Sequence, residues 1–193
     1  MAERAKKKAT YEDLLSIPEN MIGEIINGEL IVTPRPSPKH MLSTSVLGGR
    51  IVPPFQFGEG GGPGGWIILY EVEIQLGDDT LVPDLAGWRK ERFPKKLEHN
   101  WIDVVPDWVC EVLSPRTALR DRTQKMAIYA THRLRHLWLV DPFNMTLEVF
   151  RLESHWVPAG VFGGREKARL EPFQEMEIDL GDLWMGSLTG DEV

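Results

Sequence analysis

Two carboxylates stand in segments that are otherwise largely apolar, and a lysine follows them in the chain. Asp84 lies within LVPDLAGW, Glu111 within WVCEVLSP, and Lys125 in the segment that follows Glu111. Removing an ionised group from water costs several kcal/mol unless a partner, a proton or a metal compensates it. Two carboxylates that meet in a dry cleft either share a proton or bind a hard cation, and Mg²⁺ leaves coordination positions for substrate phosphate oxygens. These three residues are therefore candidates for a magnesium site.

The surrounding residues predict strands for both acids and a helix for the lysine. Five of the six positions in 108–113 are apolar, which is typical of a strand covered on both faces. In each strand the carboxylate shares its face with apolar residues two positions away. The segment ALRDRTQKMAIYATHRLR contains no Gly or Pro and predicts a helix. If the two strands pair, the acids converge.

Other segments predict the elements around this centre. We expect a short helix near 11–17, a hairpin at Asn27-Gly28, and a helix from Ser37 to about Arg50 that ends at Gly48-Gly49. FGEGGGPGGW predicts a loop, WIILYEVEIQL and TLVPDLAGW one strand each, and the region after residue 135 three strands. Strand, helix and strand around Glu111 form a crossover unit, so the predicted class is α/β with a mixed sheet.

Composition limits the kind of protein. The 193 residues, 42% of them hydrophobic, fit one domain over 11–193 after a flexible basic segment at 1–10. No window predicts a membrane span and no leader-like apolar stretch follows the N-terminus, so we expect a cytoplasmic protein. Cys110 is the single cysteine, which excludes an intrachain disulfide. The net charge is −7, yet residues 89–135 carry eleven Lys or Arg against six Asp or Glu, which fits either a solvated face or a phosphate-facing patch.

Several short motifs together resemble a known family. EIINGEL, SPKH, VPDLAGW, CEVLSP, the spacing of four between Asp121, Lys125 and Tyr129, and HLWLVDP are similar to the Uma-two family within the PD-(D/E)xK nuclease superfamily. The resemblance covers residues 11–151. It implies a restriction-endonuclease-like mixed β-sheet flanked by helices with extra hairpins, DNA as the partner, and a homodimer.

The resemblance also implies roles for particular residues. Asp84 and Glu111, with the carbonyl of Val112 and with Glu24, would hold Mg²⁺ or its substitute Mn²⁺. Lys125 would act on the attacking water or the transition-state charge. The residues implied to lie at the rim and contact phosphate are Arg116, Arg120, Arg122 and Tyr129.

Alternatives remain open at several positions. The superfamily pattern places a lysine where Leu113 stands, so Lys125 would replace it from the next helix. Asp121 and Lys125 also fit an ordinary helical ion pair, Glu24 a solvent-facing hairpin residue, and His40 a structural role. Asp107 stands too close to Glu111 to be its partner and more simply marks a turn. For the molecule, the second hypothesis is an inactive nuclease-like fold that binds nucleic acid or associates with itself.

Overall fold

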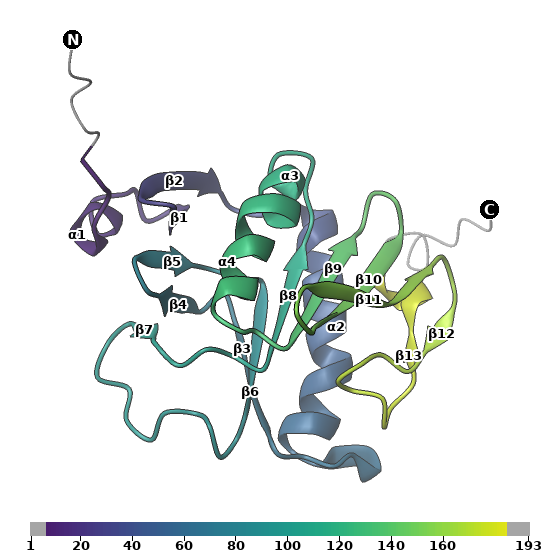
Figure 1. Ribbon diagram of the computed structural model, residues 1–193. Helices are drawn as coiled ribbons and strands as arrows, with labels where there is room; N and C mark the ends of the chain where they lie inside the picture. The colour runs from purple at the N-terminus through teal and green to yellow at the C-terminus, as the bar shows by residue number, and fades with distance from the viewer. Residues whose placement is uncertain (1–6, 185–193) are drawn as a thin grey trace.

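The computed structural model describes residues 7–184 (Figure 1). Residues 1–6 of the expected flexible segment lie outside the described residues. In chain order the elements are α1 Tyr11–Leu14, β1 Met21–Ile26, β2 Glu29–Pro34, α2 Pro38–Gln56, η1 Glu59–Gly61, β3 Trp66–Tyr70, β4 Glu73–Leu76, β5 Asp79–Leu81, β6 Leu85–Arg89, β7 Trp101–Ile102, β8 Trp108–Val112, α3 Ala118–Arg120, η2 Asp121–Lys125, α4 Met126–Thr131, β9 His136–Asp141, β10 Thr146–Leu152, β11 Trp156–Gly163, β12 Lys167–Ala168, β13 Ile178–Asp179 and η3 Leu180–Leu183.

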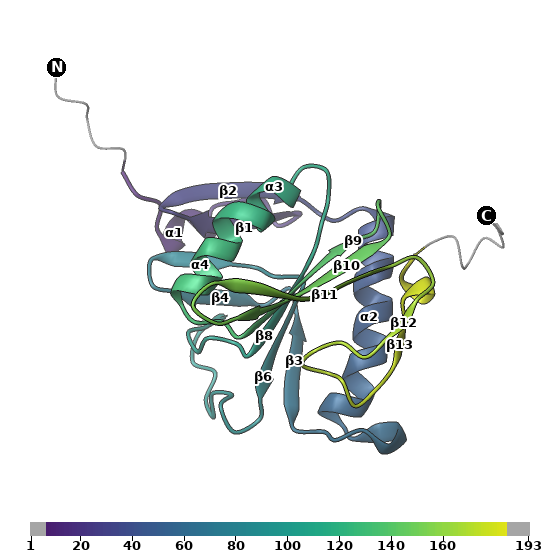
Figure 2. The same ribbon diagram turned by 45° about the vertical axis from the view of Figure 1, so that its right-hand side comes forward.

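A six-stranded mixed sheet forms the centre of the fold, in the order β11-β10-β9-β8-β6-β3. β8 and β9 are parallel and the other neighbours antiparallel, which confirms the predicted α/β class with a mixed sheet. A five-stranded sheet has the order β2-β1-β5-β4-β7, and β12 pairs with β13. In both views α2 runs along one side of the central sheet, while α4 lies toward the five-stranded sheet (Figures 1 and 2).

Alternate residues of β8 enter two separate cores. Trp108, Cys110 and Val112 pack in the cluster that includes α2 and the C-terminal elements. Val109 and Leu113 pack in the cluster that includes α4 and the five-stranded sheet. All five β8 residues are buried, so the strand is covered on both faces, as its apolar run predicts. Glu111 therefore faces the layer between the central sheet, α4 and the five-stranded sheet.

Two segments predicted as single strands are each divided between the two sheets. WIILYEVEIQL gives β3 in the central sheet and β4 in the other, and Glu71 between them has a positive φ of 44°. TLVPDLAGW is divided in the same way into β5 and β6, because the chain bends at Pro83-Asp84. Asp84 thus stands in the break between two strands, and the prediction that it lies inside one is wrong.

The helices differ from their predicted bounds for identifiable reasons. α2 does not end at Gly48-Gly49 but continues to Gln56. Gly48 serves a close approach instead, since a Cβ there would lie 1.7 Å from the Tyr70 hydroxyl oxygen. The predicted helix after β8 is confirmed, but it contains a π turn at Asp121–Lys125 between α3 and α4. Across the described range no helix is long and apolar enough to cross a membrane.

Candidate active site

Glu111 belongs to the buried cluster, where it accepts one hydrogen bond and forms one ion pair. The residue is 3% exposed, and its Oε1 lies 2.7 Å from the Lys125 ammonium and accepts a hydrogen bond from the Tyr129 hydroxyl at 2.5 Å. Burial raises the pKa of Glu111 well above its ordinary value, the Lys125 ammonium opposes that shift, and neighbouring acids add to it. Glu111 therefore holds a proton more readily than an exposed glutamate does.

Lys125 is the cation of the cluster. Lys125 as a whole residue is 2% exposed. Its Nζ lies 2.9 Å from Glu24 Oε1 and 2.7 Å from Glu111 Oε1. Burial alone would lower the pKa of Lys125, but Glu111 and Glu24 raise it well above its ordinary value. The ammonium therefore stays charged. Asp121, its predicted helical partner, is farther away at 4.0 Å, so the simple helical ion pair does not describe this lysine.

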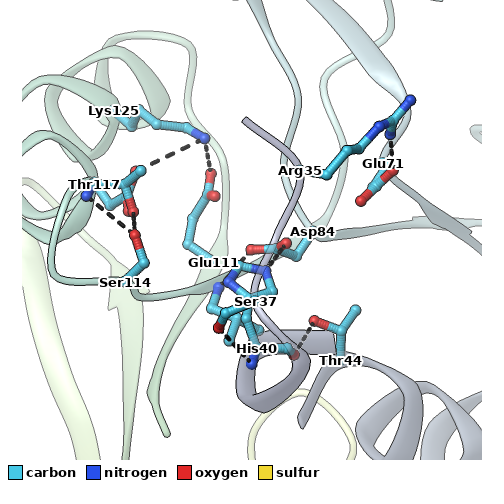
Figure 3. Close-up of polar contacts among 12 residues, drawn as sticks. Arg35, Ser37, His40, Thr44, Glu71, Asp84, Glu111, Ser114, Thr117 and Lys125 are labelled. Carbon is cyan, nitrogen blue, oxygen red and sulfur yellow. Dashed lines mark hydrogen bonds and ion pairs between the residues drawn. The ribbon is translucent and has the colours of Figure 1, made fainter. Parts of the chain in front are cut away.

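Asp84 is fixed on both carboxylate oxygens. Oδ2 accepts the Val112 N–H at 2.7 Å, and Oδ1 is paired with His40 Nε2. β6 and β8 pair with Leu85 opposite Cys110, so continuing the register by one residue sets Asp84 opposite Glu111. The condition posed from the sequence is therefore met by β6 and β8, with Asp84 just before β6 and not within it. Figure 3 shows Lys125 reaching toward Glu111 on one side of the site and Asp84 with His40 on the other.

Glu24 and Asp121 complete the cluster from two other elements. Glu24, on β1, is 6% exposed and its Oε1 also accepts the Val82 N–H at 2.9 Å. It therefore faces the site and not solvent. Asp121 is 5% exposed, and burial raises its pKa, with Lys125 opposing the shift. The π turn directs both Asp121 and Lys125 inward, and such turns are frequent at functional sites.

The cluster lines a cavity of about 350 Å³. Its floor contains Glu24, Asp84, Glu111, Asp121 and Lys125, with His40 beside them. Aliphatic, proline and small hydroxyl residues and Phe143 form much of the remaining wall. Among them are Ile22, Thr33, Pro34, Pro36, Ser37, Val82, Val112, Ser114, Pro115 and Thr117.

The residues expected at the rim divide into three groups. Arg116 is exposed and lines the cavity. Arg120 and Arg122 do not line it, and Arg122 is paired with Glu148 on β10. Tyr129 is fully buried, so its expected place at the rim is wrong. Its helix face is turned toward Glu111, where the hydroxyl orients the carboxylate.

The sequence favours structural roles for His40 and Asp121, yet both line the cavity. The signal for His40 was available in SPKH, since a Ser37 N-cap places the third residue after it in the first helical turn. What the sequence does not reveal is that this turn faces Asp84. Asp107, by contrast, is a buried structural acid that accepts the Arg89 N–H at 2.8 Å and pairs with Arg92.

The donor set suits a hard divalent cation, although the side chains as they stand do not form a ready cage. Among residues 7–184, no three His, Cys, Asp or Glu side chains are grouped as ligands of one ion. Three carboxylates nevertheless lie within 4.0 Å of the Lys125 ammonium, Asp84 lines the same cavity, and the raised pKa values of Glu111 and Asp121 reflect burial and nearby acids. Carboxylate oxygen is the donor that Mg²⁺ prefers. The chemistry of the residues therefore fits the ion.

Two comparisons found known proteins that resemble this chain in sequence and fold. A family model, Uma2, described as "Putative restriction endonuclease", matches residues 8–181. A crystal structure described as that of "a putative nuclease belonging to DUF820" from Anabaena variabilis is similar, with a TM-score of 0.74 and 25% sequence identity. The match covers 91% of this chain and 97% of that one. No curated protein matches the chain.

Proposed function

The chain belongs to the Uma2 family, and from this membership and the buried acids around Lys125 we propose that it is a metal-dependent endonuclease that hydrolyses DNA phosphodiester bonds. The observation that carries the proposal is the position of Lys125 Nζ, within 2.9 Å of Glu24 and 2.7 Å of Glu111 in a cavity that also contains Asp84. An ordinary surface ion pair needs no such enclosure.

Asp84, Glu111 and Glu24 are the residues that would hold Mg²⁺ or Mn²⁺. When bound, the ion would lower the pKa of water and neutralise charge on the scissile phosphate. Glu111 lies on β8 and Asp84 directly precedes β6, which pairs with β8, so the sheet sets their separation before any ligand arrives. Tyr129 and His40 each fix one of these carboxylates, which limits the reorganisation that binding requires.

Lys125 contributes a fixed positive charge. Glu24 and Glu111 keep its ammonium protonated and aimed into the cavity, where it would orient the attacking water or stabilise charge on the phosphate. Arg116, at the mouth, would contact a neighbouring phosphate without reading sequence. This assignment gives Lys125 the role that the superfamily assigns at the position of Leu113.

Cleavage of plasmid and labelled oligonucleotides tests the proposal. We expect cutting that requires Mg²⁺ or Mn²⁺, stops with EDTA, and falls at least about a hundredfold in Glu111→Gln. Glu177→Gln, at an exposed position, serves as the matched control. Equal activity in Glu111→Gln and the unmodified chain would assign the cutting to a contaminant or another site and overturn the proposal.

A second candidate is a nuclease-like fold that binds nucleic acid or associates with itself without cutting. It is favoured by the lack of a preformed three-ligand group in the described part of the chain. A thermal denaturation series with Mg²⁺ and Mn²⁺ separates the two functions, because a ligand that binds the folded state raises Tm. An unchanged Tm together with no cleavage favours the second candidate. Light scattering on the same samples tests the expected homodimer.

A further inference from the structure

We propose that the site acts on an unpaired DNA strand in preference to a continuous duplex. This inference rests on the proposed nuclease function and specifies its substrate. Three features carry it: the depth of the acids, the small number of unpaired cations at the mouth, and an exposed aromatic ring beside an apolar wall.

The acids and the lysine lie too deep for a rod-like substrate. Glu24, Glu111, Asp121 and Lys125 are only 2–6% exposed, and the cavity above them is about 350 Å³. Cavities of this size admit a group no larger than a small ligand. Duplex DNA is stiff over many base pairs and presents its phosphates on a convex surface. A flexible single strand can bring one phosphate down to these residues, whereas a duplex would first have to bend or open.

The charges around the mouth are too few for an extended duplex footprint. Duplex affinity rises with the number of phosphates that Lys and Arg neutralise. Arg35, at the cavity wall, is already paired with Glu71 at 3.0 Å, and Arg122 with Glu148. Arg116 is exposed at the mouth, and within residues 7–184 no acid is recorded as its partner. One or two phosphates are therefore the footprint that these charges support.

Phe143 provides a surface on which a base can stack. It lies in the turn between β9 and β10, is 44% exposed, and lines the cavity. This turn rises beside the first turn of α2 (Figure 2), and Lys39 Nζ lies 5.5 Å from the centre of the Phe143 ring. Proteins that bind single strands combine such an aromatic face with a nearby cation. A base stacked on Phe143 would be unavailable for pairing.

The test compares one labelled sequence in three forms: a single strand, a perfect duplex, and a duplex with a central unpaired bubble. With Mg²⁺ present, we expect the single strand and the bubble to be cut at least about tenfold faster than the duplex, with bubble cuts confined to unpaired positions. A duplex cut as fast as the single strand overturns the inference and leaves the nuclease function intact.

Variants of exposed phenylalanines provide the matched control. Phe143→Ala should lower the single-strand cleavage rate and binding by about tenfold, since stacking on an aromatic ring contributes that order per base, while Phe143→Trp should retain both. Phe57→Ala, 63% exposed at the far end of α2, should change neither. An unaffected Phe143→Ala variant contradicts the stacking role.

Binding separates failure of the inference from failure of the function. Fluorescence anisotropy with the single strand and the duplex, measured with Glu111→Gln, needs no cleavage. If no substrate is cut but the single strand binds more tightly, the endonuclease proposal fails and the strand preference stands. If the duplex binds equally or more tightly, the strand preference fails whatever the cleavage result.

Discussion

Lys125 holds together a cluster in which acids outnumber cations. Glu24 and Glu111 each contribute one oxygen to its ammonium, and all three residues are at most 6% exposed. A buried ion pair is weak evidence for stability by itself, but removing one partner leaves uncompensated charge. The same contacts that would serve catalysis therefore also bear on folding.

We predict that Lys125→Met lowers the free energy of unfolding of the metal-free protein by about 3–5 kcal/mol near neutral pH, because the buried carboxylates lose the cation that compensates them. Denaturant unfolding measures this change. The double variant Lys125→Met with Glu111→Gln should recover part of the loss. Equal stability of Lys125→Met and the unmodified chain would mean that the acids are already neutral without the ammonium. Cleavage should be lost in both variants.

His40 positions Asp84 through the bond between Nε2 and Oδ1. We predict that His40→Ala lowers kcat roughly 10–100-fold while KM changes little, as is typical when the partner that orients a ligating carboxylate is removed. Steady-state cleavage kinetics provide the measurement, with exposed His155→Ala as control. A loss confined to KM would assign His40 to substrate contact instead.

At the scale of elements, the breaks in regular structure position the site. The bend between β5 and β6 frees Asp84 to turn its carboxylate toward Val112, and the π turn presents Asp121 and Lys125 together. The sequence predicts one unbroken strand for the first of these segments and one unbroken helix for the second. Local propensity favours continuation in the helical segment, where the interruption depends on tertiary contacts that a single sequence does not display. In TLVPDLAGW, by contrast, Pro83-Asp84 are unfavourable inside a strand and stand at the break.

His136, the first residue of β9, gives a pH-dependent prediction. Burial lowers its pKa below the ordinary value of 6.5, and Glu171, whose Oε1 lies 3.4 Å from Nδ1, opposes that shift only in part. The unfolded chain therefore binds a proton here at a higher pH than the folded chain. Stability from this group is complete above 6.5 and is lost as pH falls through and below that value.

Urea unfolding at pH 7.5 and pH 5.5 measures this dependence. We expect His136→Gln to lose less stability on acidification than the unmodified chain, because glutamine takes up no proton. His155→Gln, at an exposed position, should follow the unmodified chain. Identical pH profiles for His136→Gln and the unmodified chain would contradict the assignment.

At the scale of the whole molecule, an aromatic cluster joins α2, the central sheet and the C-terminal elements. Phe173 lies at its centre, with ring centroids 4.7 Å from Phe55, 4.8 Å from Trp66, 4.9 Å from Trp108 and 5.6 Å from Trp138. This core packs on the face of β8 opposite Glu111, so it supports the strand without entering the cavity.

We predict that Phe173→Ala lowers the free energy of unfolding by about 3–5 kcal/mol, equivalent to a Tm decrease of roughly 6–20 °C, because it opens a cavity among rigid rings. Calorimetry measures the shift. Phe57→Ala removes the same atoms from an exposed site and should move Tm little. A similar Tm for both variants would mean that the cluster repacks around the lost ring.

The sequence was informative where a residue conflicted with its surroundings. Glu111 in an apolar run and Asp84 after Pro83 identified the two acids, and β6, which directly follows Asp84, pairs with β8. The sequence was misleading where a residue type commonly plays either of two structural roles. Gly48 fits a helix stop but provides space for Tyr70, and Tyr129, expected at the rim from the family resemblance, is buried with its hydroxyl donating to Glu111.

The π turn also has a consequence for how this chain tolerates changes in length. A π turn corresponds to one residue more than a regular helix needs, and each residue rotates a helix by about 100°. Deleting Gln124, which is exposed, should let the segment close as an ordinary helix that still folds. Circular dichroism should then show native helix content. Asp121 and Lys125 would be three residues apart instead of four, and residues at either spacing are neighbours on one helix face, so cleavage should persist. The extra residue of the π turn could thus be removed without separating the two side chains.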